Sequence, residues 1–340
     1  MSTGGLVGVL GAGRIGRMHA RNLRELGREV AVADADPARA RQLADAEGLR
    51  AAESVPALLG SVDCVLVAAA THAHRELVLE CLDRQLPVFC EKPVALDVAG
   101  TREVAARAAA SPAPLQVGLQ RRFDRGYRAA REAVRGGELG WLHTLRAVTA
   151  DASPPPPEFV AASGGIFRDC GLHDFDAIRW ITGREVRSVQ ATGANRGAAH
   201  FGDNGDADTA AALLELDDGT LATATASRYN GAGYDVRLEV CGSRGALFVG
   251  NDDRAPLPSA ERDVPWPRAE PYGTFVDRFA DAYRAEVAAF LAVAAGERDN
   301  PCGVREALEA LHVAEACELS RAERRTVAVD EVREADLPRP

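Results

Sequence analysis

The chain has 340 residues, of which 46% are hydrophobic, so it can bury one large core or, more in keeping with its length, two. A net charge of −10 argues against nucleic acid or an anionic membrane as the main partner. The longest apolar run, from Cys64 to Ala70, is far shorter than the roughly 18 residues of a membrane span, and the first residues lack the basic and apolar segments of a secretory signal.

Seven cysteines are scattered along the chain without a C-x-x-C pair or a cluster with histidine. An odd, scattered set is typical of reduced core thiols, and it predicts neither a disulfide framework nor a zinc site. We therefore expect a cytoplasmic protein that binds no metal.

The first predicted elements form a dinucleotide-binding unit. An apolar strand over Leu6–Leu10 leads into a glycine-rich turn and then into a helix that ends near Gly27. In such a turn the glycines permit a tight bend and the close approach of a pyrophosphate, while the helix N-terminus supplies amides and partial positive charge. A lone G-x-G-x-x-G motif is weak, but this one lies between a strand and a helix as the mechanism requires. The residues predicted to hold the phosphates are Gly11, Gly13, Arg14, Ile15 and Gly16.

The second strand, Glu29–Ala33, ends at Asp34, and this carboxylate bears on the choice of cofactor. A carboxylate here accepts hydrogen bonds from the adenosine ribose and repels a 2′-phosphate, so it favours NAD over NADP. Arg39 and Arg41 follow closely and leave NADP open as the less favoured cofactor. The dipeptide Asp36–Pro37 predicts the N-cap and first position of the next helix.

Strands and helices continue to alternate, which predicts a doubly wound parallel sheet. Ligands of such sheets bind at the carboxyl ends of the strands, so Glu91-Lys92-Pro93, which follows the strand Val88–Cys90, is placed on the same edge as the glycine turn. Thr71, His72 and His74 follow an earlier strand and are candidates to line the cofactor, although a capping or packing role is favoured for each histidine. The other predicted elements are strands over 64–68 and 115–119 and helices over 74–85 and 97–110.

Lys92 is the only lysine in the chain, since the other 39 of the 40 basic residues are arginine. A compact ammonium can donate a proton in a tight pocket, whereas a guanidinium stays charged and forked. Composition alone leaves chance survival of one lysine equally open, but the place of Lys92 at the carboxyl edge of the sheet favours a functional role. Pro93 fixes the backbone there, and a cis Lys92–Pro93 bond is compatible with the motif.

The character of the sequence changes near Gly140, where strands begin to follow one another with short connections. Consecutive strands predict an open, mostly antiparallel sheet with helices on one side. In one strand Ala222, Ala224 and Ala226 alternate with small polar residues, which suits close contact between sheets and predicts a subunit interface. The predicted strands cover 141–151, 186–196, 208–216, 221–228, 235–241, 246–250 and 326–329, the helices 125–136, 171–183, 274–294 and 304–322, and the loops 154–157 and 255–273.

The densest polar stretch runs from Gly164 to Asp176. If it is helical, Asp169, His173 and Asp176 lie on one face, at i, i+4 and i+7, next to an apolar face. A neutral imidazole is the natural base near neutral pH, and a carboxylate one turn away can orient it. The residues alone slightly favour a second interpretation, in which Asp169 is an N-cap and His173 is a structural histidine.

Together these motifs resemble the glucose–fructose oxidoreductase, inositol dehydrogenase and rhizopine-catabolism family (Gfo/Idh/MocA), and most closely its myo-inositol 2-dehydrogenase branch. The resemblance covers nearly the whole chain. It rests on the glycine turn, on the E-K-P segment, on Gly164-Gly165 followed by Asp169 and His173, and on the segment Arg278–Tyr283. It implies an N-terminal Rossmann domain, a second domain whose open sheet mediates oligomerisation, and often a tetramer.

The resemblance also implies roles for single residues. Lys92, Asp169 and His173 match the catalytic triad of inositol dehydrogenases, in which the lysine reaches the substrate hydroxyl beside the nicotinamide. Arg122 and Asp176 match positions that contact the polyol. The full cofactor set is then Gly11, Gly13, Arg14, Ile15, Gly16, Asp34, Thr71, His74, Glu91 and Lys92, and the substrate set is Arg122, Asp151, Asp176, Tyr229, Tyr234 and Tyr283.

Two segments depart from the family pattern. Phe123 stands where R-R-Y-D commonly has tyrosine, and Arg228–Asp235 resembles the R-Y-G-Y-D of the branch with extra residues. The insertion leaves open whether Tyr229 or Tyr234 reaches the substrate. Asp151 and the prolines after it are candidates for a pocket wall, with a plain loop role equally open.

We therefore expect an α/β protein with an NAD-binding Rossmann domain over residues 1–122 and a substrate-binding and oligomerisation domain over 123–340, whose C-terminal helix packs back on the first domain. The hypothesis is metal-independent oxidation of a secondary ring hydroxyl of an inositol-like polyol by NAD, in a homo-oligomer that binds neither nucleic acid nor membrane. Two alternatives remain open: a pyranose or nucleotide-sugar oxidoreductase of the same family, and a non-catalytic NAD-binding regulator.

Overall fold

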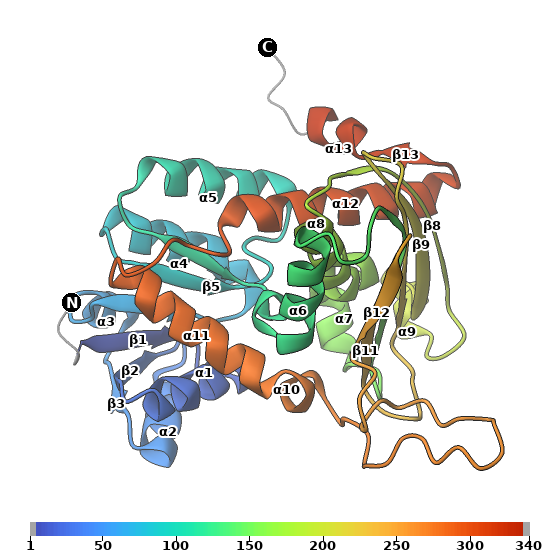
Figure 1. Cartoon of the computed structure of the whole chain (residues 1–340). Helices are drawn as coiled ribbons and strands as arrows, with labels where there is room; N and C mark the ends of the chain where they lie inside the picture. Colours follow the sequence, from blue (N-terminus) through green and yellow to red (C-terminus); the bar gives the residue numbers. More distant parts are fainter. Residues whose placement is uncertain (1–4, 336–340) are drawn as a thin grey trace. The chain divides into compact units, whose positions relative to one another are not determined.

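The structure is a computed structural model that describes residues 5–335. The chain folds into two compact units (Figure 1). Unit 1 combines the residues up to Phe123 with Asp281–Leu308, and unit 2 combines Asp124–Ala280 with the residues from Glu309 onward. The expectation that no secretory signal is present rests partly on the first four residues, and these lie outside the described residues.

Unit 1 is built on a six-stranded parallel sheet with the order β3-β2-β1-β4-β5-β6. This confirms the predicted doubly wound sheet. The strand order reverses between β1 and β4, and ligands of such sheets bind beside that switch point. The strands are β1 Leu6–Leu10, β2 Glu29–Ala33, β3 Arg50–Ala51, β4 Cys64–Val67, β5 Val88–Glu91 and β6 Leu115–Gly118, and the helices are α1 Arg14–Glu25, α2 Pro37–Glu47, α3 Val55–Leu59, α4 Thr71–Asp83 and α5 Val98–Ala110.

Helix α2 shows how local residues set the helix ends of unit 1. The side chain of Asp36 accepts a hydrogen bond from the Ala38 amide at 2.9 Å, and Pro37 occupies the first position, where no amide hydrogen is needed. Gly48 ends the helix in the left-handed conformation, with φ at 64°. The predicted N-cap is confirmed.

Helix α11 (Ala280–Ala294) comes from late in the sequence but completes the core of unit 1. Its Val287 and Phe290 are buried in one cluster with Val9, Leu23 and Phe89, which belong to β1, α1 and β5. Burying an aliphatic or aromatic side chain contributes roughly 1.5–3 kcal/mol, so this helix is an integral part of the nucleotide-binding unit.

Unit 2 is built on a seven-stranded sheet with the order β12-β11-β7-β10-β9-β8-β13. Within the described residues β10 pairs with β7 in parallel and the other neighbours are antiparallel, which confirms the predicted open, mostly antiparallel sheet. The strands are β7 Leu142–Ala150, β8 Val186–Ala194, β9 Thr209–Leu216, β10 Leu221–Ser227, β11 Asp235–Gly242, β12 Gly245–Val249 and β13 Val327–Ala328.

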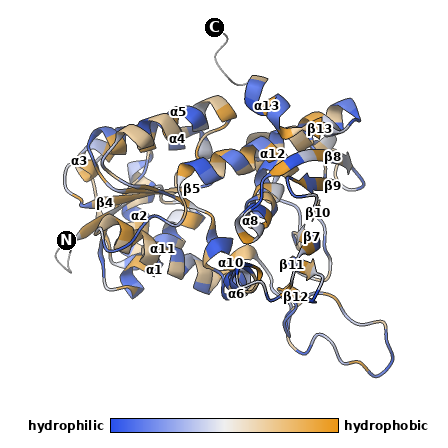
Figure 2. Cartoon of the chain, turned by 45° about the horizontal axis from the view of Figure 1, so that its top comes forward, coloured by the Kyte–Doolittle hydropathy of each residue, from blue (hydrophilic) through white to orange (hydrophobic). Residues whose placement is uncertain are grey.

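The two faces of this sheet differ. Ala222, Ala224 and Ala226 on β10 are buried, on the face that contacts α8 (Leu172–Thr182), whereas Thr225 on the same strand is exposed. The helices carry both hydrophobic and hydrophilic residues (Figure 2). The alternation of small residues in β10 therefore separates an inner face of alanines from an outer face of hydroxyl side chains.

Several elements differ from the prediction. The four-proline segment was expected to be a loop, but Pro157 opens the helix α7 (Pro157–Ser163), because proline fits the first helical position. The helix expected over 274–294 is interrupted at Phe279, which ends α10 (Phe275–Arg278) before α11 begins. Short elements without a clear periodicity escaped the sequence analysis, namely β3, α3, α9 (His200–Asp203) and α13 (Val329–Ala335). The remaining helices are α6 Arg125–Arg135 and α12 Val304–Glu323.

Candidate functional site

The glycine turn after β1 has the shape of a phosphate cradle. Gly11 has a φ of +108°, and a β-carbon there would lie 2.5 Å from the Ala68 carbonyl oxygen. A β-carbon on Gly16 would lie 1.8 Å from the Gly11 carbonyl oxygen, so neither position tolerates a side chain. The N-cap of helix α1 is Gly13, which has no side chain that could cap the first turn. Arg14 and Ile15 lie in its first turn.

Asp34 at the end of β2 is tied to this turn. Its Oδ2 accepts a hydrogen bond from the Ala12 amide at 2.7 Å, and its Oδ1 accepts one from the Asp36 amide at 3.0 Å. Each carboxylate oxygen has further lone pairs, so the group can still accept hydrogen bonds from a ribose. The turn and the acidic residue are thus held at one end of the sheet, as a dinucleotide requires.

The segment after β5 is braced by His74. The Lys92–Pro93 peptide is cis, and Lys92 is half-buried. The buried His74 ring places Nδ1 2.7 Å from the Pro93 carbonyl oxygen and Nε2 2.9 Å from the Ala69 carbonyl oxygen. The His74 ring therefore lies between the main chain before α4 and the main chain of the E-K-P segment.

The start of α4 also lines a groove of about 320 Å³ whose wall is mainly polar, and Thr71 and His72 lie on it. Arg75, Glu76, Asp97 and Glu103 complete its polar lining. Thr71 and His74, the two α4 residues proposed for the cofactor, therefore meet different surroundings: Thr71 lies on this groove, and His74 is held by two carbonyl oxygens.

The polar contacts of the candidate site in unit 2 centre on a residue that the sequence analysis did not select. Arg228, whose side chain is 2% exposed, follows β10 and donates through Nη1 to Asp169 Oδ2 at 2.8 Å and to Asp151 Oδ2 at 3.1 Å. The same nitrogen lies 3.0 Å from Cys170 Sγ. Burial lowers the pKa of the Arg228 guanidinium, but Cys170 and the two carboxylates raise it above its ordinary value, so the group is a permanent cation.

This cation brings together two residues that the sequence analysis placed at the site. Asp151 lies just after β7 and Asp169 lies in a π-helical turn over Phe167–Gly171, so Arg228 fixes one carboxylate relative to the other. The sequence offered a signal for it, because Arg228 opens the R-Y segment in which only Tyr229 and Tyr234 were selected.

His173 lies in the first turn of α8, immediately after the π-helical turn, and is half-buried. The apolar side of the segment is confirmed, since Leu172, Phe175 and Ile178 are buried. Asp176 is also buried. The expected Asp169–His173–Asp176 spacing therefore spans a π-helical turn and an α-helix, not one continuous α-helix.

The two candidate tyrosines lie in different surroundings. The Tyr229 side chain is exposed, and its hydroxyl accepts a hydrogen bond from the Ala198 amide at 3.0 Å. A β-carbon on Gly197 would lie 2.3 Å from the Tyr229 ring, so this glycine is needed for the ring to pack there. Tyr234 is buried, and its amide donates to the Tyr272 carbonyl oxygen at 2.7 Å.

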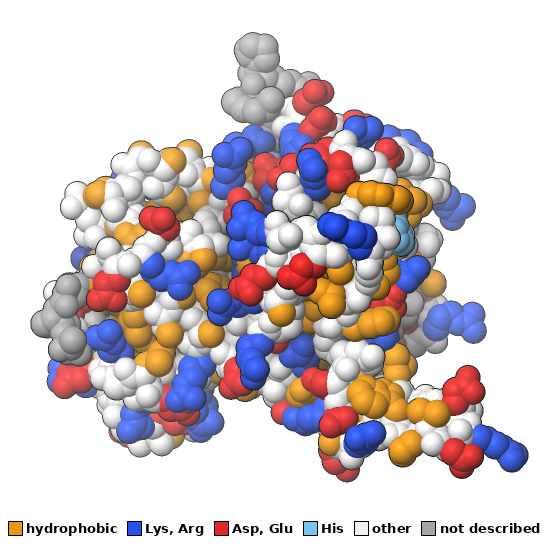
Figure 3. Space-filling view, viewed as in Figure 1, with side chains coloured by type: hydrophobic (Ala, Val, Ile, Leu, Met, Phe, Trp, Pro, Cys, Tyr) orange, Lys and Arg blue, Asp and Glu red, His pale blue; other side chains and the backbone are white. Residues whose placement is uncertain are grey.

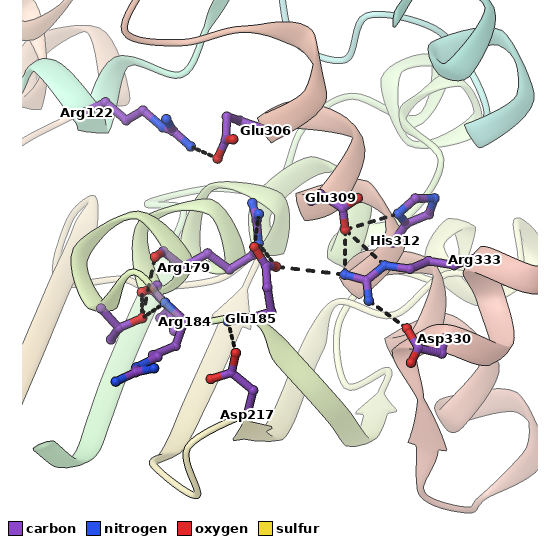
Figure 4. A network of polar contacts seen from close by, with 12 residues as sticks. Arg122, Arg179, Arg184, Glu185, Asp217, Glu306, Glu309, His312, Asp330 and Arg333 are labelled. Carbon is purple, nitrogen blue, oxygen red and sulfur yellow. Dashed lines mark hydrogen bonds and ion pairs between the residues drawn. The ribbon is translucent and has the colours of Figure 1, made fainter.

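Two further substrate candidates lie in unit 1. The buried Arg122 donates to Glu306 Oε2 at 3.0 Å and to the Pro301 carbonyl oxygen at 3.2 Å (Figure 4). Tyr283 is buried on α11, with its ring centroid 6.1 Å from that of His19. Arg122 thus ties the end of the first sheet to the segment that leads into α12.

Family models match both parts of the chain. Residues 6–119 match the model described as the oxidoreductase family with an NAD-binding Rossmann fold, and residues 127–248 match the GFO/IDH/MocA C-terminal domain. The chain belongs to the Gfo/Idh/MocA oxidoreductase family.

Relatives in this family match over almost the whole chain. A myo-inositol dehydrogenase of Streptomyces leeuwenhoekii is 43% identical over 92% of this chain and 96% of the relative, and the myo-inositol 2-dehydrogenase of Thermotoga maritima is 36% identical over 96% and 99%. The solved structure of a scyllo-inositol dehydrogenase from Lactobacillus casei with bound NAD(H) and scyllo-inositol is 27% identical, with a TM-score of 0.86 and coverage of 96% and 99%.

The Gfo/Idh/MocA membership fits the rest of the structure. The Rossmann unit and the mixed sheet reproduce the architecture of a crystal structure of a putative myo-inositol dehydrogenase from Sinorhizobium meliloti, at a TM-score of 0.88, 34% identity and coverage of 95% and 99%. Among residues 5–335, no helix is both long and apolar enough to traverse a bilayer.

Proposed function

We propose that this oxidoreductase is an NAD-dependent dehydrogenase that oxidises a secondary ring hydroxyl of a cyclitol to a ketone. The observation that carries the proposal is the full-length similarity to dehydrogenases named for myo-inositol and scyllo-inositol. Relatives of this kind match from the glycine turn to the C-terminal helices, which covers both the cofactor unit and the unit with the candidate acid–base residues.

NAD is the proposed cofactor, with NADP disfavoured. The glycine turn and the uncapped start of α1 suit a pyrophosphate, and the carboxylate of Asp34 suits ribose hydroxyls but repels a 2′-phosphate. When bound, NAD supplies the hydride acceptor. The cradle residues bind and orient it, with Thr71, His74, Glu91 and Lys92 proposed as further contacts.

For the chemistry we propose that three residues act on the same carbinol group of the substrate. His173 takes the hydroxyl proton, Asp169 orients the imidazole, and the Lys92 ammonium stabilises the developing alkoxide. A positioned general base is worth about 10²–10⁴ in rate, and one placed charge-stabilising donor about 10²–10³. Arg228 supports the arrangement because its charge fixes the Asp169 carboxylate. The proposed polyol contacts are Arg122, Asp151, Asp176, Tyr229, Tyr234 and Tyr283.

The outer face of the second sheet is the proposed subunit interface of a homo-oligomer. Phe248 on β12 is 58% exposed, and Leu213 and Leu221 are also exposed on neighbouring strands of the sheet. Hydrophobic side chains are visible on the loop that follows β12 as well, where Leu257 and Val264 are exposed (Figure 3). Burial of the three exposed side chains of the sheet face, Leu213, Leu221 and Phe248, would favour association. The seven cysteines are free thiols, which supports the proposed cytoplasmic location.

Turnover of the wild type and of Lys92→Ala, with NAD and a panel of inositols, inosamines and hexoses, tests the function. We expect oxidation of a cyclitol by the wild type, and a loss of about 10²-fold or more in Lys92→Ala with NAD binding near normal. Arg107→Ala, which removes an exposed cation of the same unit, should keep wild-type turnover. Wild-type turnover in Lys92→Ala would refute the catalytic role of the lysine. Activity on hexoses alone would refute a cyclitol as the substrate.

A further inference from the structure

A buried polar cluster lies beneath the E-K-P segment of unit 1. It consists of His19 on α1, Glu91 at the end of β5 and Glu286 on α11, and one polar atom from each lies within 4.8 Å of those of the other two. The side chains of His19 and Glu286 have 0% exposure. Apolar rings surround them, with Phe89 5.2 Å from His19 between ring centroids.

The hydrogen-bonding capacity of this cluster is unbalanced. His19 Nε2 lies 2.6 Å from Glu91 Oε1, so the ring donates to that carboxylate. Neither Glu286 oxygen, nor His19 Nδ1, makes a hydrogen bond with the described residues. The oxygens of an ionised carboxylate are acceptors only, so an ionised Glu286 would place two buried acceptors where none of the described residues donates to them.

A proton fits this imbalance better than a metal ion. Protonation of Glu286 removes one of two neighbouring buried charges and supplies an O–H donor. Ligands of a zinc ion stand about 2.0–2.2 Å from the metal, which would place them about 3.4 Å apart, whereas the His19 and Glu91 atoms are already in direct contact. Burial, and then the charge of Glu91, raise the pKa of Glu286 well above its usual range.

We propose that Glu286 is a protonated acid at neutral pH and acts as a positioning residue for Glu91-Lys92-Pro93. The role for Lys92 rests on the proposed function. The Glu91 carboxylate is confined on one side, because Oε1 is held by His19, while Oε2 lies beside Gly118 in space that a β-carbon would crowd. Ionisation of Glu286 would repel this confined group, and the Glu91 main chain leads directly to Lys92.

The titratable groups that face Glu286 are His19 from α1 and Glu91 from β5, with Tyr283 one turn earlier on the same helix beside the His19 ring. The main chain of the helix is held separately, since Gln116 Nε2 donates to the Glu286 carbonyl oxygen at 3.0 Å. Substitution of the Glu286 side chain therefore changes the cluster while this main-chain anchor remains.

Infrared difference spectroscopy tests the protonation directly. The spectrum of the wild type minus that of Glu286→Gln should show the C=O stretch of a protonated carboxylic acid at neutral pH, and the band should disappear at alkaline pH. Glu297→Gln, an exposed position shortly after α11, is the matched control and should leave the band in place. In the wild type labelled with ¹³C at glutamate carboxyl groups, one resonance should stay at the protonated position at neutral pH.

A wild type without this band and this resonance would overturn the proposal. So would a stoichiometric metal found by elemental analysis in the wild type and lost in Glu286→Gln. Neither measurement needs turnover, so they decide the protonation even if the wild type oxidises no cyclitol, an outcome that would refute the proposed function separately.

Kinetics test the positioning role. Glu286→Gln keeps a neutral polar group of the same shape and should retain kcat, whereas Glu286→Leu should lower kcat about 10- to 100-fold with little change in the KM for NAD. Rescue by glutamine distinguishes positioning from general packing. An equal loss of kcat in both variants, or no loss in Glu286→Leu, would overturn the role.

Discussion

Glu309 on α12 gives unit 2 a measurable dependence of stability on pH. Its Oε2 accepts hydrogen bonds from Arg333 at 3.0 Å through Nε and at 2.5 Å through Nη2, and it lies 3.5 Å from His312 Nδ1 (Figure 4). Burial alone would raise the pKa of Glu309, but the hydrogen bonds from His312 and Arg333 and the Arg333 charge lower it from 4.5 to about 2.

A lowered pKa in the folded state means that the ionised carboxylate stabilises the fold. The contribution is complete above the unfolded pKa near 4.5 and is lost as the pH falls toward about 2. At about 1.4 kcal/mol per unit, the shift corresponds to about 3 kcal/mol at neutral pH and about 2 kcal/mol at pH 3.5. The Glu309 side chain is only 20% exposed, so solvent screening removes little of this energy.

We expect Glu309→Gln to lower the free energy of unfolding by about 3 kcal/mol at pH 7 and by about 2 kcal/mol at pH 3.5. Urea denaturation followed by tryptophan fluorescence measures the unfolding of unit 2, because Trp141, Trp180 and Trp266 all lie in this unit. Arg333 is not left unpaired, since it also donates to Asp330 at 2.7 Å.

The matched control is Glu331→Gln, which removes a carboxylate whose pair with Arg325 is exposed and should change stability far less. A difference between the wild type and Glu309→Gln that does not depend on pH would refute the linkage. A difference below about 1 kcal/mol at pH 7 would refute the magnitude, because it would be no more than a surface ion pair provides.

Three further predictions concern the cofactor, the candidate site and assembly. Asp34→Ser should raise the ratio of kcat/KM for NADP over NAD about tenfold, since one like-charge repulsion is removed, and an unchanged ratio would contradict the role of Asp34. Arg228→Met should lower kcat about tenfold, because Asp169 loses the guanidinium that fixes it, and steady-state kinetics showing full kcat would argue against this role. Phe248→Arg should dissociate the oligomer in light scattering whereas Leu257→Arg on the exposed loop should not; equal effects would exclude the sheet face.

The strand, turn and helix that hold the cofactor could be predicted from the sequence because each depends on neighbouring residues. A strand, a turn that needs glycine at Gly11 and Gly16, and a helix start follow within a few residues, and Asp36 with Pro37 specifies a helix start through contacts two residues away. Such features depend on backbone conformation and neighbouring amides, which a single segment encodes.

The residues that were missed depend on contacts between distant segments. Arg228 reaches a carboxylate 59 positions earlier, and nothing in its own segment shows that Asp169 will be beside it. Glu286 appears in an apolar helix as one acid among many, and its significance arises only when β5 and α1 place Glu91 and His19 next to it. The helix at Pro157 was missed for the opposite reason, because local rules allowed both a loop and a helix start.

The inclusion of α11 in the core of unit 1 has a consequence for biosynthesis. During translation the ribosome delivers all six strands of the parallel sheet long before Val287 and Phe290 leave the exit tunnel. Until then the nascent polypeptide presents an unfinished apolar surface around Phe89 and Leu23, which is a natural substrate for holding chaperones. Maturation of the nucleotide-binding unit is thereby coupled to synthesis of the chain through α11.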